Sequence, residues 1–82
     1  MKIKKNVAVS ASGLIFNPDT GESFTVNPMG ASIINDLKEG KAQLEIVQAT
    51  IGKYFVEKTT FEKDFEDFLG LLKNYSLVEN GE

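Results

Sequence analysis

The hydrophobic period of the chain changes at Asn27-Pro28, and this change restricts the fold more than any other feature. Before it, apolar and polar residues alternate in short runs around residues 7–9, 14–16 and 24–26, a pattern typical of strands. After it, apolar residues recur every three or four positions, which predicts helices. Asn27 is suited to cap the first helix and Pro28 to open it. The sequence therefore predicts three short strands followed by helices.

The segment between the second and third strands predicts a tight hairpin. It consists of Asn17-Pro18-Asp19-Thr20-Gly21. Pro18 presets a turn, Asp19 favours it and Gly21 can adopt a positive φ. The segment lacks the ligand spacing of an EF-hand, so it does not predict a calcium site.

The first two predicted helices each carry one apolar stripe. The first runs to about Lys38 and stops at Gly40, and the second begins near Ala42 or Gln43. Their stripes comprise Met29, Ile33, Ile34 and Leu37 in the first helix and Leu44, Val47, Ile51, Tyr54 and Phe55 in the second.

The third predicted helix is the longest and the most amphipathic. It opens with a capping box, in which Thr59 precedes Glu62 by three positions. Its apolar face comprises Phe61, Phe65, Phe68, Leu69, Leu72 and Tyr75. Leu77 and Val78 close the apolar pattern, and residues 79–82 form a polar end that we expect to fray.

The predicted elements fit in one domain. A chain of 82 residues supports one hydrophobic core, so we expect a single domain over residues 1–82 with its core at about 7–78. The expected fold class is α+β and winged-helix-like, with three short N-terminal antiparallel strands packed on a three-helix bundle. Cysteine is absent, so stability must come from packing without disulfides.

The composition indicates a binding module and not an enzyme. The chain has neither His nor Cys, which excludes thiol and imidazole catalysis and zinc sites built from nitrogen and sulfur ligands. The serines have no activating partner beyond Lys. Asp64 and Asp67 share an exposed helix face, which we interpret as solvated. We therefore expect no catalytic residue, no metal and no cofactor.

The charge and the apolar runs argue against nucleic-acid and membrane partners. The net charge is −3 and none of the nine basic residues is Arg, the residue that grips phosphate bidentately. No apolar stretch approaches the roughly 18 residues needed to span a bilayer. Ser10, Ser12 and Gly13 interrupt the apolar run after the N-terminal lysines, so a secretory signal is not favoured and we expect a cytoplasmic protein.

The third predicted strand suggests where a ligand binds. If this strand lies at the edge of the sheet, it offers unpaired backbone donors and acceptors beside the apolar flank of the third helix. Such a cleft suits the addition of a peptide strand, whose alternate side chains would enter pockets lined by the helix.

A block of residues across the strand–helix junction resembles the PqqD-like family. It comprises Phe24-Thr25-Val26-Asn27-Pro28-Met29-Gly30-Ala31, then Ile33, Leu37 and Glu39-Gly40. The likeness continues through Glu45-Ile46-Val47, Asp64-Phe65, Phe68-Leu69, Leu72 and Leu77-Val78. The resemblance covers about residues 7–78.

The resemblance implies a peptide chaperone or recognition element. Relatives hold the leader of a ribosomally made precursor peptide and present it to a modifying enzyme, often a radical-SAM enzyme. It implies that the guest pairs with the backbone of Ser23, Phe24, Thr25 and Val26. It also implies groove-lining positions at Asp64, Phe65, Phe68, Leu69 and Leu72.

Two other interpretations remain open at this level. The same fold could serve as a structural adaptor for a partner protein without a precursor peptide. It could also be a winged-helix DNA-binding domain, but residues 57–67 carry five acids against two lysines, which would repel phosphate.

Overall fold

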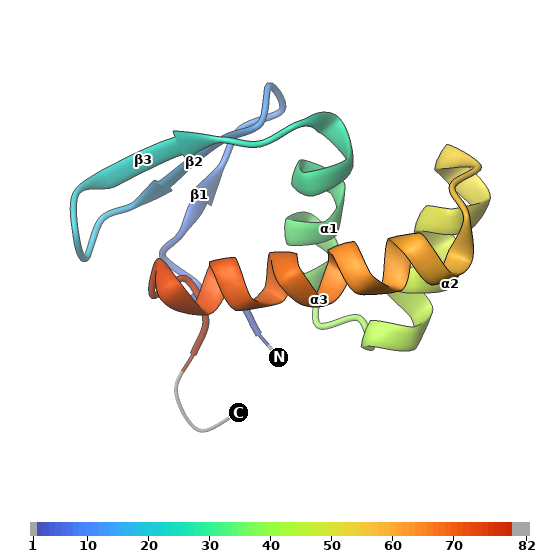
Figure 1. The fold of residues 1–82 in the computed structure, drawn as a ribbon. Helices are drawn as coiled ribbons and strands as arrows, with labels where there is room; N and C mark the ends of the chain where they lie inside the picture. The colour runs from blue at the N-terminus through green and yellow to red at the C-terminus, as the bar shows by residue number, and fades with distance from the viewer. Residues whose placement is uncertain (1, 80–82) are drawn as a thin grey trace.

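The computed structural model describes residues 2–79 and shows a small antiparallel sheet followed by three helices (Figure 1). The sheet has the order β1-β2-β3. Its strands are β1 (Ala8–Val9), β2 (Leu14–Asn17) and β3 (Glu22–Thr25), and the helices are α1 (Pro28–Lys38), α2 (Gln43–Tyr54) and α3 (Lys58–Asn74). The predicted α+β class and element order are confirmed. The polar end that we expected to fray comprises residues 79–82, and residues 80–82 lie outside the part of the chain that the structure describes.

The β2–β3 hairpin forms where the turn residues predicted it. Leu14 is opposite Thr25 and Asn17 is opposite Glu22. Gly21 has a φ of 75°, and its N–H donates to the Asn17 carbonyl oxygen at 2.8 Å. Glycine adopts this left-handed conformation without the clash that a Cβ would cause.

The predicted bounds of α1 are also confirmed. The Asn27 Oδ1 accepts a hydrogen bond of 2.7 Å from the Gly30 N–H, and Pro28 occupies the first turn. The helix ends at Lys38, and Gly40 follows with a φ of 82°. Local chemistry at both ends therefore determines this helix.

The predicted cap of α3 is wrong. The helix begins at Lys58, and Glu57, not Thr59, is the N-cap residue. Its carboxylate accepts hydrogen bonds from the Thr59 N–H at 3.1 Å and from the Thr60 N–H at 2.8 Å. These backbone N–H groups belong to the first helical turn and have no carbonyl partner within the helix. The Glu57 carboxylate therefore takes the role that a Ser, Thr, Asp or Asn side chain usually has at the cap position.

The predicted apolar stripe of α2 is partly wrong. Leu44 is 65% exposed and Phe55 is 92% exposed, whereas Ile46 and Thr50 are buried beside the predicted Val47. Phe55 follows the helix in the left-handed conformation, with a φ of 55°, so the helical period no longer sets its direction.

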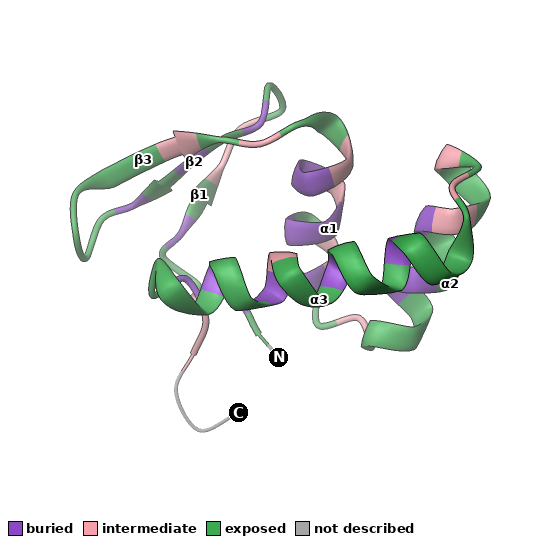
Figure 2. Cartoon of the chain, viewed as in Figure 1, coloured by how far each residue is buried: buried purple, intermediate pink, exposed green. Residues whose placement is uncertain are grey.

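The core collects residues from both ends of the chain. Buried residues lie on all three helices and on β2 (Figure 2), and the apolar ones form one hydrophobic cluster. Ile3, which precedes the expected core at 7–78, is buried and pairs with Val78 in an antiparallel bridge. The Lys4 N–H donates to the Leu77 carbonyl oxygen at 2.8 Å. Within residues 2–79, no helix has the length and apolar character needed to cross a membrane.

Candidate functional site

The free edge of the sheet is the outer side of β3. The Val26 N–H donates to the Gly13 carbonyl oxygen of the neighbouring segment at 2.8 Å. Backbone groups of an antiparallel strand alternate in direction, so Phe24 also faces β2 whereas Ser23 and Thr25 direct their N–H and C=O groups outward. The predicted edge strand is therefore present, and it offers unpaired donors and acceptors to a guest strand.

A groove of about 570 Å³ begins where β3 ends. It lies between α1 and α3. One wall comes from residues 26–27 and α1, and the other from residues 56–57 and α3. The lining residues are Val26, Asn27, Met29, Gly30, Ile33, Val56, Glu57, Thr60, Phe61, Asp64, Phe65 and Phe68.

On its α3 side, the groove is lined by an aromatic row and a polar row. The aromatic row is Phe61, Phe65 and Phe68, at helical spacings of four and three. Phe61 and Phe65 are buried, and their rings stack with centroids 5.7 Å apart. The polar row, which we call the rim, is Glu57, Thr60 and Asp64, and all of its residues are exposed.

On the opposite wall, Gly30 of α1 has no side chain, so Val26, Asn27 and Phe68 can all lie close to its backbone. A Cβ at this position would lie 3.0 Å from the Val26 Cβ and 3.3 Å from the Asn27 Oδ1. It would also lie 3.5 Å from the Phe68 Cζ. Any larger residue would therefore narrow the groove at the point where β3 leads into it.

The electrostatic character of the groove is acidic. Glu57 and Asp64 are its only charged residues within the part of the chain that the structure describes. Hydrogen bonds from the Thr60 side chain, the Thr60 N–H and the Thr59 N–H hold the pKa of Glu57 below its ordinary value. Glu57 is therefore ionised at neutral pH.

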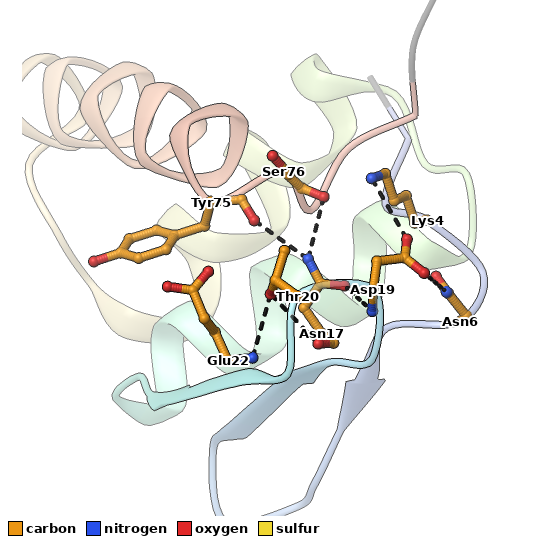
Figure 3. Close-up of polar contacts among 8 residues, drawn as sticks. All are labelled: Lys4, Asn6, Asn17, Asp19, Thr20, Glu22, Tyr75 and Ser76. Atoms are coloured by element: carbon orange, nitrogen blue, oxygen red, sulfur yellow. Dashed lines mark hydrogen bonds and ion pairs between the residues drawn. The ribbon is translucent and has the colours of Figure 1, made fainter.

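The sheet is tied to the C-terminal end of α3. The Phe24 and Tyr75 rings stack. The Asn17 side chain points toward the backbone of Tyr75 and Ser76, where the chain leaves α3 (Figure 3). The Asn17 Nδ2 donates to the carbonyl oxygens of Tyr75 at 3.3 Å and Ser76 at 3.4 Å. Its Oδ1 accepts from the Asp19 N–H at 3.0 Å. These contacts fix the distance between β3 and the last turn of α3.

The structure separates the predicted site residues into groups. Val26, Asp64, Phe65 and Phe68 line the groove, and Ser23, Phe24 and Thr25 form the strand that leads to it. Leu69 and Leu72 are not among the residues that line the groove, and both are buried in the hydrophobic core.

Several residues that line the groove were not predicted as site residues from the sequence, among them Met29, Ile33, Val56, Glu57 and Phe61. Met29 and Ile33 were predicted in the core stripe of α1, and Phe61 was predicted as part of the apolar face of α3 without a site role. The helical spacing of Phe61 from Phe65 was the available signal. No local pattern marks Val56 or Glu57, which reach the groove only through the packing of α3.

Comparison with known proteins gives a family match and a structural match. The family model described as Coenzyme PQQ synthesis protein D (PqqD) matches residues 13–78. The solved structure of TbiB1 in complex with the TbiA(beta) leader peptide is similar at 34% sequence identity and a TM-score of 0.87. The similarity covers 100% of this chain and 99% of that one. No curated protein matches the chain significantly. Both matches include β3 and the groove.

Proposed function

The chain belongs to the PqqD family, and on this basis we propose that it binds the leader of a ribosomally made precursor peptide and presents it to a modifying enzyme. The family resemblance predicted from residues 24–31 is confirmed by the match to residues 13–78. TbiB1, whose structure is similar along the whole chain, is solved in complex with a leader peptide.

The observation that carries the proposal is the free edge of β3, which runs directly into the groove. Ser23 and Thr25 offer outward backbone groups, and Val26 already lines the groove. A guest strand would gain main-chain hydrogen bonds at the edge and would place alternate side chains over the aromatic row.

The Phe24–Tyr75 stack determines the path of the guest. It closes the space between β3 and the end of α3, so the guest lies along the outer side of β3 and enters the groove beyond Val26. The rise along α3 from Phe68 to Glu57 is about 16 Å. An extended chain covers this length with about five residues, in addition to those along the strand edge.

We assign the proposed contacts to two layers. Ser23, Phe24, Thr25 and Val26 provide the strand edge, and Asp64, Phe65 and Phe68 contact the guest in the groove. Leu69 and Leu72 support these residues from the core. In this proposal the protein catalyses no reaction itself, and it acts in the cytoplasm, where a newly made precursor is first present.

Titration of ¹⁵N-labelled protein with candidate leader peptides tests the proposal. Amide signals of residues 23–26 and of α3 should shift with each recognised leader, and a scrambled peptide of the same composition should leave them in place. If no leader moves these signals, leader recognition is wrong. If a neighbouring modifying enzyme moves them without any leader, the adaptor interpretation is favoured.

A further inference from the structure

The polar side chains that line the groove differ in how their hydrogen-bonding groups are used. Asn27 caps α1 through its Oδ1. Glu57 caps α3 with both carboxylate oxygens, and the Thr60 hydroxyl donates to the Glu57 Oε1 at 2.7 Å. Asp64 is the exception, because among residues 2–79 no hydrogen bond or ion pair involves its carboxylate.

The position of Asp64 makes its carboxylate a determinant of what binds. Asp64 lies next to Phe65 and one helical turn from both Phe61 and Phe68. A peptide seated on the aromatic row would remove water from this carboxylate, and burying a charge without a partner is unfavourable. A guest that offers a charged donor at this point replaces the lost water with a charge-assisted hydrogen bond, about twice as strong as a neutral one.

The charges around the groove favour a cation from the guest. No basic side chain lines the groove within the described chain, and Glu57 adds a second negative charge seven positions before Asp64. Among the described residues, Lys4 pairs with Asp19, and Lys41 pairs with Asp36 and Glu39. None of these acids lines the groove.

We propose that the groove selects a peptide segment in which a Lys or Arg, flanked by apolar residues, pairs with Asp64. The inference rests on the proposed function, because it specifies the chemistry of the guest at the same site. The aliphatic stem of the basic side chain lies over the aromatic row, and its charged end reaches the rim. The neighbouring apolar side chains fill the space between Phe65, Phe68 and Ile33.

Selection from a random peptide library displayed on phage tests this inference. The targets are the unmodified protein, Asp64→Asn and the matched control Glu66→Gln, which also replaces a carboxylate by an amide on α3. Glu66 is exposed and does not line the groove. Each pool is sequenced, and selected peptides are then titrated with Lys or Arg replaced by Gln.

The inference predicts that the unmodified protein and Glu66→Gln enrich the same basic position between apolar residues. Asp64→Asn should keep the apolar preference and lose the basic one. Replacing the basic residue by Gln should weaken binding to the unmodified protein about three- to tenfold and binding to Asp64→Asn by less than about twofold.

Two results would overturn the inference, and they are distinguishable. Peptides that bind and shift the amide signals of residues 23–26, but show equal basic content in the Asp64→Asn pool, would reject the role of Asp64 and leave the proposed function standing. If no selected peptide shifts these signals, both the proposed function and the inference fail.

Discussion

The aromatic rings of Phe24 and Tyr75 stack with centroids 4.8 Å apart and planes inclined by 26°. Phe24 belongs to the edge strand, and Tyr75 follows the last residue of α3. The contact therefore joins the two elements that the proposed guest must bridge, just beyond the C-terminal end of α3 and two positions before Val26, which lines the groove. It holds β3 in place while the outer side of the strand remains free.

We expect Tyr75→Ala to lower the free energy of unfolding by about 1 kcal/mol, because a stacked aromatic pair contributes about 0.5–1.5 kcal/mol beyond its buried area. Hydrogen exchange at the Phe24 amide should become faster. Tyr75→Phe keeps the ring and serves as the control. Chemical denaturation and hydrogen exchange measure both effects, and equal losses in the two variants would contradict a role for the stack.

Asn17→Ala should lower the free energy of unfolding by about 1–3 kcal/mol, because it removes a buried side chain that donates to the Tyr75 and Ser76 carbonyl oxygens. Asn17 is 1% exposed, so water cannot easily take its place. Asn6→Ala is the matched control, since its hydrogen bond to Asp19 is exposed. Denaturation curves should show little change for this variant.

Thr25→Pro should weaken leader binding about tenfold or more, whereas Thr25→Ala should have a small effect. Proline removes the outward N–H that a guest strand would use, and the bonds between β3 and β2 stay in place. Calorimetric titration with a leader that binds the unmodified protein measures this difference. Equal losses for the two variants would argue against main-chain pairing.

Gly70→Ala and Gly30→Ala should have different effects on the free energy of unfolding and on leader binding, although both glycines lie in helices. A Cβ at Gly70 meets nothing within 4 Å, so alanine should raise the free energy of unfolding by about 0.5–1 kcal/mol. A Cβ at Gly30 presses on Val26 and approaches Phe68, so this variant should lack that gain and bind the leader more weakly. A Gly30→Ala variant that is equally stabilised and binds normally would contradict the described groove.

The Glu57 cap predicts a pH dependence. Hydrogen bonds lower the pKa of Glu57 in the folded state, so its contribution to stability is complete above the unfolded value of about 4.3 and is lost as the pH falls through the folded value. The stability difference between the unmodified protein and Glu57→Gln should therefore be present at neutral pH and shrink in acid. Denaturation across this range tests it, and a stability difference that stays constant from neutral pH into acid would contradict the role of the cap.

Local chemistry was sufficient to predict several elements. The bounds of α1 follow from Asn27 and Pro28 at its start and from Gly40 after its end. The hairpin follows from Pro18 and Gly21. Proline restricts its own φ and glycine can adopt a positive φ, and neither property depends on the rest of the chain.

The N-cap of α3 and the buried side of α2 were less predictable, because in each case more than one set of residues suits the role. Thr59 and Glu57 both lie near the start of α3, and the helix begins at Lys58, so Glu57 and not Thr59 is the cap. For α2, the apolar residues around Ile46 occur on more than one side of the helix, and only contact with α1 and α3 determined which side is buried.

The sequence by itself determined the order of the elements, the strand around Thr25 and the aromatic side of α3, because these depend on the spacing of residues along the chain. The tertiary structure placed that strand at the edge of the sheet. The tertiary structure decided which aromatic and aliphatic residues are accessible. Leu72 is buried and Phe68 lines the groove although both lie on the same apolar side of α3. Burial depends on the distant segment that packs over each residue, and spacing along one helix does not specify that segment.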